Sequence, residues 1–216
     1  MFLGDSITAL TGDRSWIKYF SQIIPLSSYT NVAVSGATLM DKNGTVYDGN
    51  PVYNPSNPTS EANNVLGNQV QKIINNNYDT PDFIIIAIGT NGGITFDNEQ
   101  EIYDTYWENN GDIKPLTNVD RKTSSGAFRY CNDKLHELYP NAMIVWCTPI
   151  QANTKSKNVA KTIQYGNNLK VLCSYGSNYY IDSEKCGILG TNEIYGGNGE
   201  DLADGLHPNA HGAKKL

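Results

Sequence analysis

Three residues at opposite ends of the chain have side chains that could work together in nucleophilic catalysis. Ser6 follows a short apolar run and a glycine at residues 2–4, whereas Asp204 and His207 lie near the end of the chain. A serine nucleophile needs a base to take its proton, and the base needs a carboxylate that orients it. The spacing of Asp204 and His207 allows one turn of chain to place the carboxylate beside the imidazole. Only the fold can bring Ser6 to them.

Two internal residues could stabilise the negative charge that develops on a carbonyl oxygen during acyl transfer. Gly36 follows the apolar segment 32–34, and Asn91 follows the apolar segment 83–88. A glycine can present its backbone N–H closely because it has no Cβ, and an asparagine offers an amide donor. Both residue types are also common turn formers, and Ser6 could simply cap a helix.

Four of these residues, namely Ser6, Gly36, Asn91 and His207, resemble in type and order the residues for which the SGNH, or GDSL-type, hydrolases are named. They stand in separate blocks that span residues 4–207: Gly4-Asp5-Ser6, Gly36, Gly89-Thr90-Asn91, and His207 preceded by Asp204. The resemblance implies a triad of Ser6, His207 and Asp204, with Asp5 fixing the turn. It also implies an oxyanion hole made by the Ser6 N–H, the Gly36 N–H and the Asn91 amide. The implied reaction is ester hydrolysis without a cofactor or metal. One departure is Gly92, where the family often has an acidic residue.

A metal site is the alternative use of His207. His207 and His211 are four residues apart, as in a metal-binding pair on a helix, and Asp204 could complete the site. Pro208 and the lack of a glutamate between the two histidines argue against it. The triad explains more residues, so we predict no metal. Two further acids near His207 are expected to be solvated: Glu200 and Asp201.

Strands and helices alternate in the pattern of a parallel sheet. Apolar segments predict strands near 1–4, 31–34, 83–88, 142–148 and 179–182, and helical periodicity predicts helices near 13–24, 65–75, 124–139 and 157–175. The order favours an α/β fold, a three-layer α/β/α sandwich around a mainly five-stranded parallel sheet, flavodoxin-like as the resemblance implies. Because ligands bind at the carboxyl ends of such strands, we expect Ser6, Gly36 and Asn91 to meet at one edge.

Length and composition set limits on the class of protein. The 216 residues predict one domain over 1–216, whose ends look trimmed, with a final short helix after Pro208. The net charge of −6 argues against nucleic acid as a partner, and no apolar run is long enough for membrane insertion. The many Asn and Tyr residues are compatible with a secreted or periplasmic bacterial protein. Oligomeric state stays open.

The four cysteines lack the C-x-x-C spacing of common zinc sites. Cys147 lies in an apolar run and is expected to be a buried free thiol. A disulfide between Cys173 and Cys186 could form, and the sequence does not decide it. Cys131 carries no further signal.

Two polar segments, 41–64 and 92–123, are predicted to be long loops that overhang the same edge of the sheet. They carry aromatic residues that could stack on sugar rings: Tyr47, Tyr53, Tyr106 and Trp107. With no apolar lid in sight, we expect a carbohydrate or other small-molecule substrate with short acyl esters, most simply O-acetyl groups. The alternatives are a lipid or thioester hydrolase, an acyltransferase with the same triad, and a carbohydrate-binding module that has lost catalysis.

Overall fold

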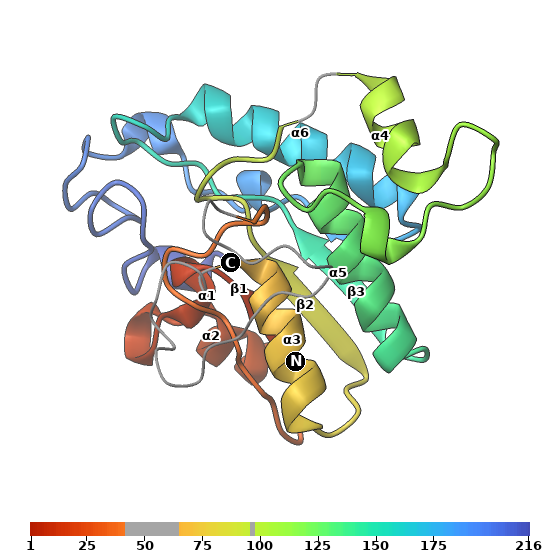
Figure 1. The fold of residues 1–216 in the computed structure, drawn as a ribbon. Coiled ribbons are helices and arrows are strands. Elements are labelled where there is room, and N and C mark those ends of the chain that lie inside the picture. Colours follow the sequence, from red (N-terminus) through yellow and green to blue (C-terminus); the bar gives the residue numbers. More distant parts are fainter. Residues whose placement is uncertain (42–64, 96–97) are drawn as a thin grey trace.

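The computed structural model describes residues 1–41, 65–95 and 98–216, and its centre is a parallel sheet (Figure 1). Its four strands follow one another in chain order: β1 (Phe2–Gly4), β2 (Phe83–Ala87), β3 (Met143–Cys147) and β4 (Tyr179–Ile181). All neighbouring pairs are parallel. Each lies where the sequence predicts a strand. The parallel order confirms the predicted fold class, and it sends the carboxyl ends of all four strands to one edge.

The structure differs from the predicted five-stranded sheet at segment 31–34, which is not a regular strand. This segment runs beside β1, with Val32 N–H donating to the Phe2 carbonyl (2.9 Å) and Val34 N–H to the Gly4 carbonyl (3.1 Å). It forms only a single bridge, between Phe2 and Asn31. The Asn31 side chain accepts from the Ala33 N–H (3.1 Å), a local contact that competes with a regular strand. The sheet therefore has four strands and an attached edge segment.

One face of the sheet is covered by three long helices. These are α3 (Leu66–Asn76), α5 (Ser124–Leu138) and α6 (Val159–Tyr175), each within about two residues of its predicted bounds. Successive strand residues point to opposite faces, so Leu3, Ile86 and Trp146 share this side, where all are buried. The main core lies here, between the sheet and the apolar sides of the helices.

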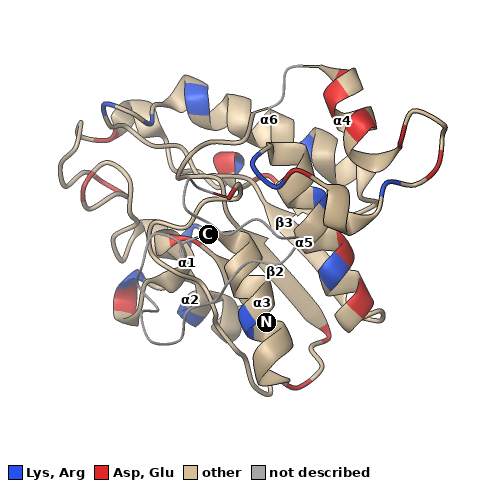
Figure 2. Cartoon of the chain, viewed as in Figure 1, with Lys and Arg blue, Asp and Glu red and all other residues tan. Residues whose placement is uncertain are grey.

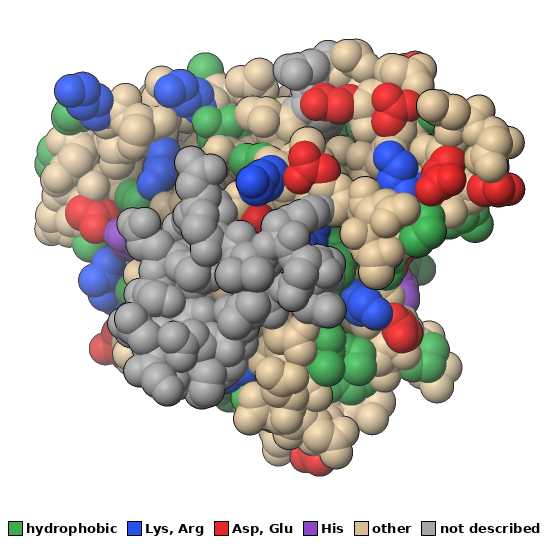
Figure 3. All heavy atoms as spheres, viewed as in Figure 1, with side chains coloured by type: hydrophobic (Ala, Val, Ile, Leu, Met, Phe, Trp, Pro, Cys, Tyr) green, Lys and Arg blue, Asp and Glu red, His purple; other side chains and the backbone are tan. Residues whose placement is uncertain are grey.

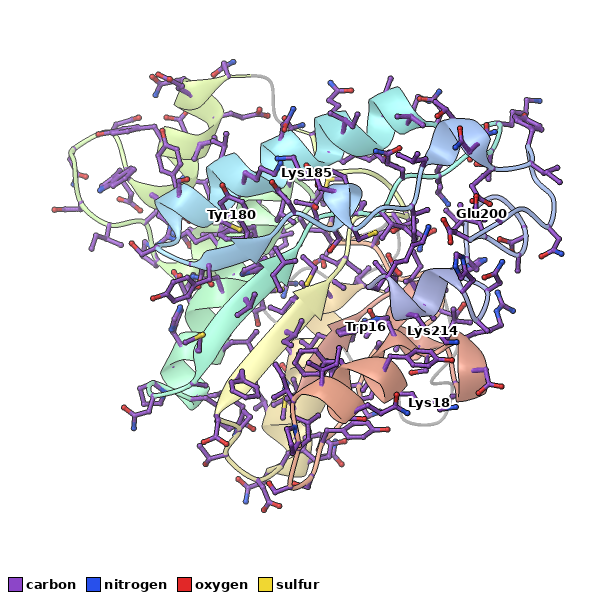
Figure 4. The ribbon with its side chains drawn as sticks, turned by 180° about the vertical axis from the view of Figure 1, so that it is seen from behind. Trp16, Lys18, Tyr180, Lys185, Glu200 and Lys214 are labelled. Atoms are coloured by element: carbon purple, nitrogen blue, oxygen red, sulfur yellow. The ribbon has the colours of Figure 1, made fainter. Side chains whose placement is uncertain are left out.

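The opposite face carries α1 (Ser6–Ala9) and α2 (Trp16–Ile23). Their buried residues, among them Ile7 and Trp16, pack on Phe2 and Ile85 in a second, smaller core. A short 3-10 helix, Gly212–Lys214, lies against α2 (Figure 4). It stands where we expected a final short helix after Pro208, and it is a single 3-10 turn rather than an α-helix.

Two further findings concern segments for which the sequence was less specific. The segment 92–123, expected to be a loop, contains α4 (Glu99–Tyr106), whose Asn98 cap accepts from the Glu101 N–H (3.0 Å). All four cysteines are free thiols, so Cys173 and Cys186 form no bridge and Cys147 is buried as expected. Within the described ranges, no helix combines the length and apolar character needed to cross a membrane.

Acidic residues are concentrated on α4 and the loop after it, whereas acidic and basic residues are mixed on the other elements in view (Figure 2). On the described part of the face in Figure 3, most Asp and Glu side chains lie at the upper right, and Lys and Arg side chains are scattered over the rest of the upper half.

Candidate active site

Ser6 is positioned by a tight passage from β1 into α1. Gly4 ends β1 with a φ of 153°, and a Cβ there would lie 2.2 Å from the Ala87 carbonyl oxygen, so only glycine fits beside β2. Asp5 then caps the helix by accepting from the Ile7 N–H (3.0 Å). Ser6 is the first residue of α1 and is 8% exposed. Its hydroxyl therefore stands at the carboxyl end of the first strand.

His207 is held by a turn that the Asp204 side chain closes. Oδ1 of Asp204 accepts from the backbone N–H groups of Leu206 (3.1 Å) and His207 (2.7 Å). Gly205 supports the turn with a φ of 75°. The second carboxylate oxygen, Oδ2, lies 2.8 Å from Nδ1 of His207. The same carboxylate thus folds the turn and orients the imidazole ring.

The fold brings this pair to Ser6 across 201 residues of chain. Nε2 of His207 lies 2.7 Å from Oγ of Ser6. A carboxylate only accepts hydrogen bonds, so Nδ1 carries the proton and Nε2 is left to accept from the hydroxyl. The arrangement can move a proton from Ser6 to His207.

Two carboxyl groups near Ser6 have shifted pKa values. Partial burial by itself would raise the pKa of Asp204. The backbone N–H and the imidazole of His207 and the Leu206 N–H together lower the pKa by more than burial raises it, so the net pKa is below its ordinary value. Asp204 is therefore a carboxylate at neutral pH. Burial raises the pKa of Asp5 to about 6, against the smaller opposing effect of the Ile7 N–H.

The residues expected to form an oxyanion hole lie at the same edge of the sheet. Gly36 has a φ of 75° in a turn closed by the Ala37 N–H on the Val34 carbonyl (3.1 Å). Thr38 pairs with Asn91 in a parallel bridge, and Nδ2 of Asn91 lies 3.3 Å from the Ala37 carbonyl oxygen. Because Gly4 pairs with Ala87, the segments that carry Ser6 and Asn91 leave the sheet side by side.

Lys157 is a residue of this region that the sequence analysis missed. Its Nζ donates to Oδ1 of Asn91 (3.0 Å), and its side chain is half-buried. A turn with Thr154 fixes its backbone, since the Lys157 N–H donates to Oγ1 of Thr154 (3.1 Å). No motif in the sequence marks this lysine, because it meets Asn91 only through the fold.

The second histidine of the pair points to a different partner. Nδ1 of His211 lies 2.6 Å from Oδ1 of Asp201, and Nζ of Lys215 lies 2.7 Å from Oδ2. Asp201 is 2% exposed, so the expectation that it is solvated was wrong, whereas Glu200 is exposed as expected. Among the described residues, the group that could hold a metal is Glu200, Asp201 and His211, and it leaves out His207.

Of the four aromatic residues expected to bind sugar, the two that the structure describes lie away from Ser6. Tyr47 and Tyr53 lie outside the described residues. Tyr106 and Trp107 end α4, which lies at the far side of the molecule from α1 (Figure 1). The Tyr106 ring packs on the main core and on Tyr175, with the ring centroids 6.0 Å apart. The chain after Asn91 leads into a helix packed on α5, which carries both residues away from the edge.

An apolar cavity of about 120 Å³ adjoins the site on the α2 side of the sheet. Its polar lining residues include Asp5 and Thr90, and Ile7, Ile85 and Ile88 belong to its apolar wall. Ser6, Asn91 and His207 do not line it.

Comparisons with known proteins give the family and the fold of the chain. The model of the GDSL-like lipase/acylhydrolase family matches residues 2–215. A possible lipase from Chitinophaga pinensis has the same fold, with 18% identity, a TM-score of 0.63, and coverage of 99% of this chain and 92% of that one. A lipase/acylhydrolase from Enterococcus faecalis has 16% identity and a TM-score of 0.53, with coverage of 99% of this chain and 88% of that one. An acetyl xylan esterase from Geobacillus stearothermophilus has 16% identity and a TM-score of 0.51, with coverage of 100% of this chain and 88% of that one. No curated protein sequence matches.

The family match, together with the parallel sheet and its helices on both faces, defines a GDSL-type, or SGNH, hydrolase, an enzyme acting on ester bonds. The family match covers nearly every residue, and the chain belongs to the GDSL-like lipase/acylhydrolase family.

Proposed function

We propose that this protein is a serine esterase that hydrolyses short acyl esters, with O-acetyl groups on carbohydrate as its substrates. Ser6 is the nucleophile, His207 the base and Asp204 the group that orients the base. The observation that carries the proposal is one continuous chain of hydrogen-bonded groups. Oγ of Ser6 lies 2.7 Å from Nε2 of His207, and Nδ1 of His207 lies 2.8 Å from Asp204.

The reaction proceeds in two acyl-transfer steps. His207 takes the proton of Ser6 through Nε2 while Oγ attacks the ester carbonyl carbon. The tetrahedral intermediate collapses when His207 returns the proton to the leaving alcohol, and the acyl group stays on Ser6. Water, deprotonated by the same imidazole, then releases the acid and restores Ser6. Asp204 stabilises the imidazolium in both steps.

The oxyanion of each intermediate needs donors at the carboxyl ends of β1 and β2. The backbone N–H groups of Ser6 and Gly36 and the Nδ2 amide of Asn91 fill this role in the proposal. Gly36 suits it because its positive φ turns the peptide chain sharply beside the end of β1. Donors fixed by the fold are effective because they need no reorganisation during the reaction.

The substrate part of the proposal is supported by the polar character of the edge around Ser6. Ser35 is exposed there, and Asn91, Lys157 and His207 are half-buried polar residues. Such groups suit hydroxyl-rich substrates better than long acyl chains. An acetyl xylan esterase among the proteins of the same fold is consistent with this direction.

The nucleophile is tested by substitution and labelling. Ser6→Ala should keep the fold and lose nearly all hydrolysis of p-nitrophenyl acetate. A fluorophosphonate should label the protein once, on the peptide that contains Ser6, as shown by mass spectrometry. Labelling at another serine, or substantial activity in Ser6→Ala, would contradict the assignment.

The substrate is tested by an acyl-chain series from acetate through butyrate to octanoate, together with acetate release from acetylated xylan. We expect kcat/KM to fall with chain length, since an added methylene at the polar edge gains none of the about 0.8 kcal/mol that burial provides and clashes with the side chains there. The apolar cavity beside Asp5 favours a second candidate, a hydrolase of longer acyl esters. A preference for octanoate would support that candidate and leave the role of Ser6 unchanged.

A further inference from the structure

We propose that Lys157 is a positioning residue that holds the Asn91 amide in the orientation needed to donate to the oxyanion. The inference rests on the proposed function. It assigns a role to a residue that lies 66 positions from Asn91 in the chain and reaches it only in the folded protein.

The orientation of an asparagine amide depends on its partners, because its two ends have opposite hydrogen-bonding character. In Asn91, Oδ1 accepts from Nζ of Lys157 (3.0 Å), and Nδ2 faces the Ala37 carbonyl (3.3 Å). A lysine ammonium can only donate, and a carbonyl can only accept. A flipped amide would therefore bring NH₂ against the ammonium and oxygen against oxygen. The two partners together select one orientation.

This orientation leaves the amide ready for its proposed role. Nδ2 carries two hydrogens, and the Ala37 carbonyl takes one of them, so the second can be donated to the developing oxyanion. The ammonium on Oδ1 also draws electron density from the amide and strengthens Nδ2 as a donor. The long contact to Ala37 is the weaker of the two constraints, which leaves Lys157 as the principal one.

The position of Lys157 is itself fixed on both sides. The Thr154 N–H donates to the Lys157 carbonyl (2.8 Å), closing a short turn, and Asn158 caps α6 immediately afterwards. The same loop contacts the His207 turn, since the Asn153 N–H donates to the Gly205 carbonyl (2.8 Å). One loop after β3 thus contacts both the turn that carries the base and the oxyanion donor.

The test is a double-mutant cycle on ester hydrolysis. Asn91→Ala should lower kcat by about 10²–10³-fold, and Lys157→Met should lower it by about tenfold or more, with KM little changed in both. If Lys157 acts through Asn91, adding Lys157→Met to Asn91→Ala should cost almost nothing further. Lys157→Arg, which keeps a donor-only cation, should recover most of the lost kcat.

Controls separate this role from others. Lys155→Met removes an exposed lysine from the same loop and should leave kcat and the melting temperature unchanged. Additive losses in the double variant, or a change in KM alone, would overturn the inference. Ser6→Ala in the same assay distinguishes the two proposals. If Ser6→Ala stays active, the proposed function fails, whereas an inactive Ser6→Ala beside a fully active Lys157→Met overturns the role of Lys157 alone.

Discussion

The carboxylate of Asp204 performs two separate tasks with its two oxygens. Oδ1 accepts from two backbone N–H groups and closes the turn, whereas Oδ2 faces Nδ1 of His207. The side chain is half exposed, so water can reach it, but its lowered pKa keeps it ionised at neutral pH. A substitution that preserves the first task and reverses the second would separate folding of the turn from orientation of the base.

Asp204→Asn is such a substitution. Its amide oxygen can still accept from the backbone of the turn, but its NH₂ group would then face Nδ1 of His207. The imidazole would carry its proton on Nε2 and could not accept from Ser6. We expect kcat to fall by up to about 10⁴-fold while the melting temperature changes little. Steady-state kinetics and thermal unfolding check this, and near wild-type turnover in Asp204→Asn would refute the proposed role.

At the scale of elements, the turn that carries His207 depends on its packing against the loop after β3. Gly205 has a φ of 75°, and a Cβ there would lie 2.5 Å from the Asn153 carbonyl oxygen. The backbone of Asn153 also accepts from the Gly196 N–H (3.0 Å). Three chain segments therefore meet closely behind the base, and only a residue without a side chain fits at their centre.

Gly205→Ala should displace this turn and lower kcat by about tenfold or more, since misplacement of a catalytic group by about 1 Å can cost 10²-fold. Gly111→Ala is the matched control. Gly111 also has a positive φ, of 84°, but a Cβ there would meet no atom within 4 Å. Both variants should lose about 1–2 kcal/mol through backbone strain. Gly205→Ala should lose more stability because its Cβ meets backbone atoms, and it alone should lose activity. Equal kinetics in the two variants would mean that the turn tolerates the displacement.

At the scale of the whole molecule, stability depends on a buried acid beside the nucleophile. Asp5 is 1% exposed, and burial raises its pKa to about 6 from an unfolded value of 3.8. Between these two values the folded protein binds more protons than the unfolded chain. The contribution of Asp5 to stability is therefore full below about pH 4 and is lost as the pH rises through about 6.

Asp5→Asn should remove this dependence, because asparagine caps α1 as well as aspartate does and does not titrate. The free energy of unfolding of the wild type relative to Asp5→Asn should fall by up to about 3 kcal/mol between pH 4 and pH 7. Urea unfolding of both proteins at several pH values measures this. A difference that is constant with pH would show that the pKa of Asp5 is not raised by burial.

Some of the site could be predicted from residue order. Ser6, Gly36 and Asn91 each follow an apolar segment, and in a parallel sheet all such positions come to one edge. Asp204 and His207 are close in the chain, so their contact depends on a local turn. The helices were predictable for a similar reason, since apolar periodicity reports which side each helix buries. The predicted strand 31–34 did not form a regular strand, because a local side-chain contact of Asn31 competes with regular pairing.

The sequence by itself determined the class of fold, the motif blocks and the edge at which they meet, because these depend on local pattern and on the geometry of parallel strands. Tertiary structure alone brought Ser6 to His207 and decided which acid is buried with His211. It also placed Lys157 on Asn91 and carried Tyr106 and Trp107 away from the site. These outcomes depend on contacts between segments far apart in the chain, and the packing of the whole fold sets such contacts while no local spacing records them.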